Sequence, residues 1–291
     1  MKVLNYGSLN IDIVYKVPHI VLPGETIAAL DVNTNAGGKG ANQAVALAKA
    51  GCEVWHAGTL GHDGIWLIDL LKKYNVKTDL IRQYEGLTGQ AIIQVSDRGQ
   101  NSIVLFGGGN QKNTKAHIDD ALSYFEEGDY LVLQNEVNLT SYMIGKAHEK
   151  GLKICLNPAP YTDDVKTWPL EMLDLLVVNE IEGQDLVGEE GSFEETLDLL
   201  VGMYPGLSIL LTAGKAGAYF GRDEQREFVP IVDSPVVDTT AAGDTFFGYF
   251  LASRIMGMNV KESMERATKA SAVTVSRSGA LDSIPFASEM S

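Results

Sequence analysis

Cysteine is scarce in this sequence, with only Cys52 and Cys155 among 291 residues. The two do not form a CxxC pair, so a disulfide scaffold is not expected, and a reducing compartment such as the cytoplasm is predicted. No long unbroken apolar run occurs, and Asn5 interrupts the first residues. These absences argue against a membrane-spanning helix and a signal peptide.

Positive charge is also scarce, since 23 Lys and Arg face 38 Asp and Glu, giving a formal net charge of -15. A chain of this sign is not expected to bind nucleic acid or an anionic membrane surface. A small anionic substrate is compatible with it if local groups attract the anion, such as backbone amides, a helix N-terminus or a metal ion. The hydrophobic content of 45% is ordinary for a globular chain and excludes a disordered one.

Short apolar runs alternate with helical patterns after about residue 50, which predicts βαβ units and a mostly parallel sheet. The predicted strands cover 54–58, 130–134, 153–156, 175–178 and 208–211, and helices are predicted over 64–73 and 139–150. Polar residues follow four of these strands, beginning at Gln134, Asn157, Asn179 and Thr212. Because open parallel sheets bind ligands beyond the carboxyl ends of their strands, these four ends predict the floor of one site.

Two pairs of short runs do not fit the βαβ pattern and predict hairpins, 11–17 with 26–33 and 89–96 with 102–106. Together they would form a small second sheet, which is either a lid over the strand ends or an edge extension without function. A further hairpin over 220–226 and 227–232 is expected and receives no role.

Glycine is concentrated in the segment Asn-Ala-Gly-Gly-Lys-Gly-Ala-Asn at 35–42, just before an apolar helical run over 43–50. Glycines before a helix let the backbone approach a ligand closely. The spacing is not that of a Walker A loop, which requires Gly in place of Asn33 and Ser or Thr in place of Gly40, and no GxGxxG fingerprint occurs. The segment is therefore interpreted as a ligand-binding helix start.

A second segment of small residues, Asp-Thr-Thr-Ala-Ala-Gly-Asp-Thr at 238–245, precedes a helical run over 246–256. Ala241, Ala242 and Gly243 would leave amides free to bind an anion such as a transferring phosphoryl group. A carboxylate there repels that anion, so Asp244 is interpreted as a base that takes a proton from an attacking hydroxyl.

A third segment, Asn179-Glu180-Ile181-Glu182, offers hard oxygen ligands that suit Mg²⁺, often through water. Together the three segments predict phosphoryl transfer from a magnesium nucleotide to a hydroxyl.

These segments resemble the PfkB family of ribokinase-like carbohydrate kinases, almost from end to end. The resemblance is carried by residues 7–12, the GGKGAN segment, 133–136, 157–160, 179–182, the DTTAAGDT segment and 277–283. It implies a three-layer α/β fold with a mostly parallel central sheet, as one domain over 1–291 with a β lid formed by about 11–33 and 88–106. Ala241 stands where many relatives have Gly.

The resemblance also implies a role for each matching residue. Asp244 would be the catalytic base, and Ala241, Ala242 and Gly243 would form the anion hole. The sugar would be held by Asn10, Asp12, Gly38, Lys39, Asn42 and Glu136, with Ala91 and Ile103 as apolar lid positions. The nucleotide would be bound by Asn179, Thr212, Gly214, Gly217 and Gly243, and the water shell of Mg²⁺ by Asn179 and Glu182. A monovalent cation, usually K⁺, would be enclosed by Asp238, Thr240, Thr274, Arg277, Gly279 and Ser283.

The activity implied is ATP-dependent phosphorylation of a pentose, with the 5-hydroxyl of D-ribose favoured. Kinases of deoxyribose, fructose or a nucleoside are the alternatives within the same class. A non-catalytic sugar- or nucleotide-binding regulator is the alternative from another class, and the intact Asp244 argues against it. The lid strands would leave unpaired edges, so a homodimer paired through them is predicted. No nucleic acid or membrane partner is expected.

Overall fold

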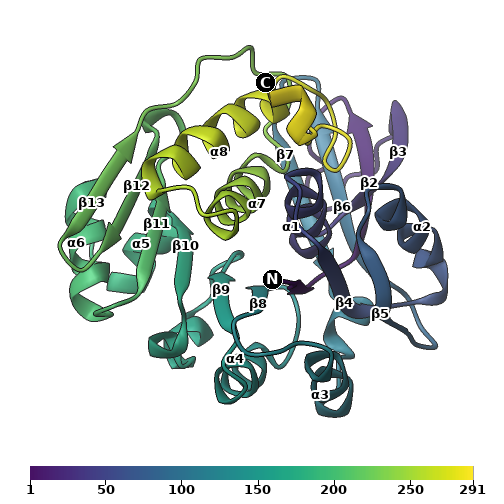
Figure 1. Cartoon of the computed structure of the whole chain (residues 1–291). Helices are drawn as coiled ribbons and strands as arrows, with labels where there is room; N and C mark the ends of the chain where they lie inside the picture. The colour runs from purple at the N-terminus through teal and green to yellow at the C-terminus, as the bar shows by residue number, and fades with distance from the viewer. Residues whose placement is uncertain (291) are drawn as a thin grey trace.

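A nine-stranded sheet forms the centre of the molecule (Figure 1), seen in a computed structural model that describes residues 1–290. The last residue of the predicted unit, 291, lies outside this range. The strand order is β13-β12-β11-β10-β9-β8-β1-β4-β5, in which the strands from β11 to β5 are parallel. The strands are β1 (Val3–Tyr6), β4 (Val54–Leu60), β5 (Lys77–Gln83), β8 (Tyr130–Gln134), β9 (Lys153–Asn157), β10 (Leu175–Asn179), β11 (Ser208–Thr212), β12 (Ala218–Arg222) and β13 (Gln225–Val229).

Helices cover both faces of this sheet, and each face has its own hydrophobic core. On one face lie α1 (Lys39–Lys49), α2 (Ile65–Lys73), α7 (Ala242–Ile255) and α8 (Val260–Val275). On the other lie α3 (Lys115–Ser123), α4 (Thr140–Glu149), α5 (Glu180–Val187) and α6 (Phe193–Met203). This confirms the predicted three-layer α/β fold.

The central strands are continuous apolar runs because a parallel sheet is buried on both faces. All five residues of β8, Tyr-Leu-Val-Leu-Gln, are buried. The register places Gln134 beside Asn157 and Asn179 beside Thr212. The polar residues at the four predicted strand ends therefore lie along one edge of the sheet.

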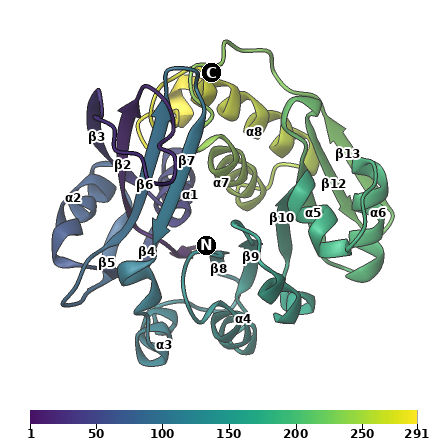
Figure 2. The ribbon, with the colours of Figure 1, turned by 180° about the vertical axis from the view of Figure 1, so that it is seen from behind.

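A second sheet of four strands lies at the β4–β5 end of the central sheet (Figures 1 and 2). Its order is β3 (Asp31–Gly37), β2 (Asn10–Val17), β6 (Gly89–Ser96) and β7 (Asn101–Phe106). The predicted strand over 26–33 is wrong in its position, because pairing with Asn10–Lys16 selects 31–37 and leaves 26–30 outside the strand. The apolar residues at 27–30 favoured a strand that begins earlier in the chain.

Other boundaries also differ from the prediction. Helix α1 begins at Lys39 and not at 43, and α7 begins at Ala242 and not at 246, so both glycine-containing segments supply the first turns of helices. The C-terminal hairpin turns at 223–224, between β12 and β13, and not between 226 and 227. Strands β1 and β5 were not predicted.

Within residues 1–290, no helix combines the length and the apolar character that crossing a membrane requires.

Candidate active site

Helix α1 begins where its backbone passes closely against the connection between β1 and β2. A Cβ atom on Gly40 would lie 2.3 Å from the Ser8 amide nitrogen, so a side chain there would push the helix away. The Ser8 hydroxyl accepts a hydrogen bond from the Gly40 amide at 3.0 Å, and Glu136 accepts one from the Lys39 amide at 2.9 Å. Gly38 adopts φ 95°, in the region that favours glycine. The glycines thus allow the first amides of α1 to be satisfied by Ser8 and Glu136.

Asp244 lies in the first turn of α7 and is buried. Asn42 Nδ2 donates to its Oδ2 at 2.9 Å, and Gln43 Nε2 donates to its Oδ1 at 2.9 Å. Both carboxylate oxygens are therefore oriented by amides of α1. The structure brings the GGKGAN and AAGD segments together at one place, although Asn42 and Asp244 are 202 residues apart in the chain.

Gln43 is a site residue that the sequence analysis missed. Besides Asp244, its Nε2 donates to Asn157 Oδ1 at 3.1 Å, and its Oε1 accepts from Gln134 Nε2 at 2.7 Å. Gln43 and Gln134 are both fully buried. The two residues at the ends of β8 and β9 thus fix Gln43, and Gln43 fixes the carboxylate.

Lys39 is surrounded by acidic residues at the start of α1. Despite its burial, the carboxylates of Asp244, Glu136 and Glu182 raise the pKa of Lys39 above its ordinary value. Burial raises the pKa of Glu136, and the hydrogen bond from Ser8 and the charge of Lys39 oppose this shift. Lys39 thus supplies the positive charge beside carboxylates from α5, α7 and the turn after β8.

The predicted sugar-binding residues of the second sheet lie next to this group. Burial, together with the nearby charge of Glu136, raises the pKa of Asp12 to about 6. Asp12 pairs with Ala91 across β2 and β6, and its carboxylate occupies the space that a side chain at Gly37 would need. Asn10 is buried and accepts a hydrogen bond from Asn110 Nδ2 at 2.7 Å.

Ile103 is separated from these residues in the second sheet. It lies on the edge strand β7, where it pairs with Ile93 and is 52% exposed. Its partner Ile93 is two residues along β6 from Ala91. Ala91, in contrast, is buried beside Asp12.

The N-terminus of α7 presents amides without a protein partner. Ala241 precedes the helix with φ 60° and ψ 7°, and no side chain caps the first turn. Because the Ala242 amide donates to the Thr239 carbonyl at 3.3 Å, it is not free as predicted. Among residues 1–290, the amides of Ala241, Gly243 and Asp244 find no such acceptor. The anion hole at this position would therefore use Asp244 in place of Ala242.

Asn179 and Glu182 form a capping box at the start of α5. The Asn179 side chain accepts from the Glu182 amide at 2.9 Å, and the Glu182 carboxylate accepts from the Asn179 amide at 2.9 Å. One oxygen of Glu182 is used in this way, and the other has no partner within the described chain. No cluster of three or more His, Cys, Asp or Glu able to hold a metal is found in that range. The unpaired oxygen of Glu182 and the Asn179 amide oxygen are hard ligands that fit Mg²⁺ held through water.

The predicted nucleotide residues of β11 and its following turn lie next to Asn179. Thr212 pairs with Asn179, and its hydroxyl donates to the Val178 carbonyl at 3.5 Å. Gly214 has φ 51° and leaves open space beside its Cα, whereas a Cβ on Gly217 would lie 2.4 Å from the Val229 carbonyl. Gly217 therefore serves the close approach of β13, and Gly214 leaves the surface open.

Five of the six predicted cation residues lie in two loops that Asp238 joins, and Thr274 lies in the last turn of α8. Asp238 Oδ2 accepts from the Gly279 amide at 3.0 Å, and its Oδ1 accepts from the Thr240 hydroxyl at 2.6 Å. Despite partial burial, these hydrogen bonds hold the pKa of Asp238 below its ordinary value. The Thr274 hydroxyl lies 3.1 Å from the Thr245 hydroxyl and 3.1 Å from the Ala270 carbonyl.

The other two residues of this set have partners of their own. The Ser283 hydroxyl donates to the Ala280 carbonyl at 2.7 Å, and the Arg277 guanidinium pairs with Glu289 at 2.7 Å. The Arg277 side chain is thus engaged with Glu289 and supplies no oxygen, so it could take part in a cation site only through its backbone carbonyl.

The chain is similar to known proteins over nearly its whole length. The family model described as "pfkB family carbohydrate kinase" matches residues 1–287. The chain is 34% identical to a ribokinase of Staphylococcus aureus over 304 aligned residues, covering 99% of this chain and 98% of the relative. It is also 30% identical to a deoxyribokinase of Salmonella typhi, covering 98% of this chain and 96% of the relative.

Two solved structures superpose closely on the whole chain. A ribokinase from Cryptococcus neoformans in complex with ADP gives a TM-score of 0.87 at 32% identity, covering 99% of this chain and 98% of that chain. An Arabidopsis thaliana ribokinase complexed with ribose and ATP gives a TM-score of 0.88 at 28% identity, covering 99% and 96%.

The fold, the site and the family match together define a phosphotransferase whose acceptor is a hydroxyl group. The chain belongs to the pfkB family of carbohydrate kinases. Within that family it is a ribokinase-family kinase.

Proposed function

We propose that this kinase transfers the γ-phosphoryl group of ATP to the 5-hydroxyl of D-ribose, with Asp244 as the general base. One observation carries the proposal: a buried carboxylate, oriented by Asn42 and Gln43, stands beside unpaired amides at the start of a helix. A proton acceptor and an anion site are thereby adjacent, as phosphoryl transfer to an alcohol requires.

The reaction follows from this adjacency. Asp244 accepts the proton of the sugar hydroxymethyl while the hydroxyl oxygen forms a bond to the γ-phosphorus. The bond between the γ-phosphorus and the bridging oxygen breaks, and ADP leaves with the electron pair of that bond. The amides of Ala241, Gly243 and Asp244 donate to the transferring phosphoryl oxygens, where the negative charge is concentrated.

The sugar would be held between α1 and the second sheet. Asn42 Oδ1 is buried without a hydrogen-bond donor, so a sugar hydroxyl would satisfy it. Asp12, Lys39 and the remaining oxygen of Glu136 would pair with further hydroxyls. A sugar lacking one of them would leave a buried group unpaired, at a cost of about 1–3 kcal/mol.

The nucleotide phosphates would lie between the start of α7 and the turn around Gly214. Asn179 and Glu182 would hold the water shell of Mg²⁺, which neutralises charge on the phosphates when it is bound. Carbonyl oxygens of the loops 238–240 and 277–283 would enclose K⁺, and the ion would stabilise the loop before α7.

A substrate panel tests the choice of sugar. ADP release is measured with ribose, 2-deoxyribose, fructose and adenosine, each with and without K⁺. Ribose is expected to give the highest kcat/KM, and K⁺ is expected to raise it. A higher kcat/KM with 2-deoxyribose would identify that sugar as the substrate in place of ribose. The similarity to a deoxyribokinase makes 2-deoxyribose a specific alternative to test.

The variant Asp244→Asn tests the base. It keeps the size of the side chain, so sugar binding measured by calorimetry should persist, while kcat should fall by about 10²- to 10⁴-fold. Binding without turnover in the unmodified chain would favour the sugar-binding regulator. Comparable kcat in Asp244→Asn would refute the assigned base.

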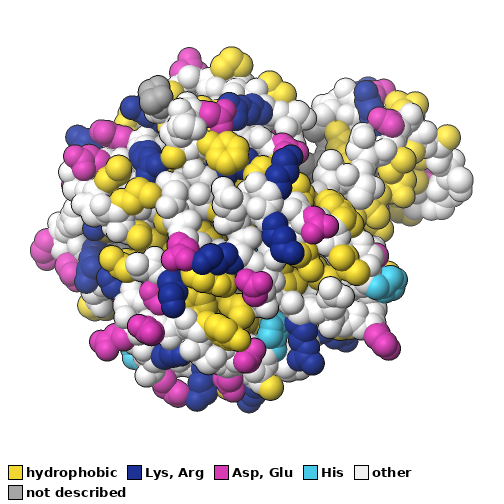
Figure 3. Space-filling model, turned by 45° about the vertical axis from the view of Figure 1, so that its right-hand side comes forward, with side chains coloured by type: hydrophobic (Ala, Val, Ile, Leu, Met, Phe, Trp, Pro, Cys, Tyr) yellow, Lys and Arg dark blue, Asp and Glu magenta, His cyan; other side chains and the backbone are white. Residues whose placement is uncertain are grey.

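The second sheet is proposed to close over the sugar and to pair with its copy in a homodimer. Val104 and Leu105 are adjacent in β7 and so lie on opposite faces, yet they are 64% and 56% exposed. Figure 3 shows hydrophobic side chains on the lobe that projects from the body. A monomer by sedimentation at micromolar concentration would contradict the homodimer. The cytoplasm remains the predicted location.

A further inference from the structure

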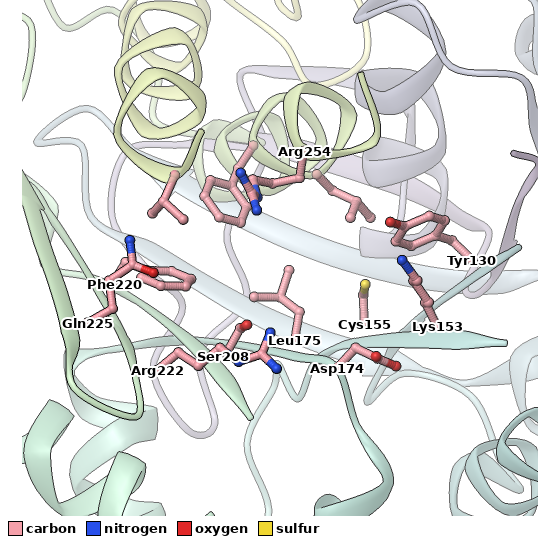
Figure 4. Close-up of a pocket in the computed structure, with 13 residues that line it drawn as sticks. Tyr130, Lys153, Cys155, Asp174, Leu175, Ser208, Phe220, Arg222, Gln225 and Arg254 are labelled. Atoms are coloured by element: carbon pink, nitrogen blue, oxygen red, sulfur yellow. The ribbon is translucent and has the colours of Figure 1, made fainter. Parts of the chain in front are cut away.

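A cavity of about 270 Å³ lies at the edge of the sheet opposite to Asp244 (Figure 4). The first residues of four adjacent strands line it, namely Tyr130, Lys153, Leu175 and Ser208. The C-terminal part of α7, the first residue of α8 and the hairpin of β12 and β13 close its other sides. No residue of the candidate active site takes part, because that site occupies the carboxyl ends of the same strands.

Positive charge is concentrated in this cavity, in contrast to the chain as a whole. Lys153, Arg222 and Arg254 line it together with a single acidic residue, Asp174. Figure 4 shows the three cationic side chains entering from three different elements, β9, β12 and α7. The lining thus carries two net positive charges in a protein whose formal net charge is -15.

None of these cations is neutralised within the cavity. The Asp174 carboxylate accepts a hydrogen bond from the Ile154 amide at 2.8 Å. The closest approach of Arg222 to a carboxylate is to Asp223 outside the lining, at 3.7 Å, where both side chains are more than half exposed. Over residues 1–290, Lys153 and Arg254 form no ion pair. One guanidinium N–H group of Arg254 donates to the Met258 carbonyl. The remaining N–H groups of Arg254, together with Lys153 and Arg222, are therefore available to a ligand.

We propose that this cavity binds a phosphate monoester of a small polyol. A phosphate monoester carries close to two negative charges at neutral pH, which match the two net positive charges of the lining. Arginine binds phosphate through paired N–H groups, and the two arginines face the cavity from different sides. A carboxylate ligand would supply one charge and leave one cation unpaired.

The rest of the lining suits the polyol part of such a ligand. Ser208 and Gln225 offer a hydroxyl and an amide, and Phe220 and Phe250 offer an apolar surface. The volume of about 270 Å³ accommodates a phosphate group and several carbon atoms, but not a nucleotide. The site stands independently of the proposed function, since the two share no residue.

Calorimetric titration with glycerol 3-phosphate tests the proposal on the full chain. Saturable binding of the phosphate ester is expected, and glycerate, which carries one carboxylate, should bind at least about tenfold more weakly. Arg222→Gln and Arg254→Gln should each weaken glycerol 3-phosphate binding about tenfold or more, because each removes a charge-assisted hydrogen bond. Arg98→Gln, which removes an exposed arginine at the turn between β6 and β7, is the matched control and should bind as the unmodified chain does.

The thermal unfolding midpoint shows whether each variant is folded, which we expect because the three arginines are exposed. Absence of binding in the unmodified chain overturns the proposal. So does equal loss in Arg98→Gln, or unchanged binding in folded Arg222→Gln and Arg254→Gln. Equal affinity for glycerate would overturn the assignment to a phosphate ester.

Discussion

Replacing Gln43 by Glu tests how the base is held. The substitution keeps the shape of the side chain and the acceptor for Gln134, but it places a carboxylate oxygen 2.9 Å from Asp244 Oδ1 in place of an amide donor. Two unit charges about 4 Å apart repel each other by about 4 kcal/mol at an effective dielectric constant of about 20. This repulsion should keep one proton bound to the two carboxylates up to a pH about three units higher than without it.

The pH profile of kcat measures this effect. The acid limb of Gln43→Glu should move upward by about three pH units relative to the unmodified chain, because Asp244 must be deprotonated to act as a base. Gln83→Glu, at an exposed position on β5, makes the same chemical change away from the site and should leave the limb in place. An acid limb that stays within half a unit in folded Gln43→Glu would refute the reasoning.

Three further predictions concern stability. Because burial raises the pKa of Asp12 to about 6, the folded chain binds this proton more tightly than the unfolded chain does. The free energy of unfolding should therefore fall as the pH rises from about 4 to about 6. Urea titrations should show that Asp12→Asn removes this fall. Lys49 is buried, and its Nζ donates to the carbonyls of Leu281 and Ile284 at 2.8 and 2.7 Å. Lys49→Met should lower the free energy of unfolding, measured in urea, by about 2–4 kcal/mol because both hydrogen bonds are lost. An unchanged value would contradict a stabilising role of these hydrogen bonds. Ala241 has a left-handed φ of 60°, a conformation that costs alanine more energy than glycine. Ala241→Gly should therefore raise the free energy of unfolding by about 0.5–1 kcal/mol and raise the thermal midpoint with it. A lower midpoint would argue against strain at this residue.

The central sheet could be predicted from the sequence wherever its strands are buried. The five residues of β8 were predicted with their observed bounds, because a buried parallel strand is a short run of apolar residues. Strand β5, Lys-Thr-Asp-Leu-Ile-Arg-Gln, lies at the edge of the sheet and is largely exposed, so its sequence lacks such a run. Its place is decided by pairing with β4, which no local pattern encodes.

The candidate site was partly predictable for a similar reason. Asp244 and Asn42 stand in segments whose small residues are conspicuous, so the sequence draws attention to both. Gln43 is a single polar residue at the start of an apolar helical run, and its partners Asn157 and Gln134 are about a hundred residues away. Only the folded arrangement gives it a role. The Asn179-x-x-Glu182 spacing was interpreted as a metal site, but it is also the signature of a capping box.

The holding of Asp244 by α1 has a consequence for the making of the protein. The carboxylate comes from α7, near the end of the chain, whereas the amides that aim it come from its first fifty residues. During synthesis the helix that aims the base is complete long before the base itself emerges from the ribosome. On the proposed assignment of Asp244 as the base, a prematurely terminated chain lacks an oriented proton acceptor and cannot transfer the phosphoryl group.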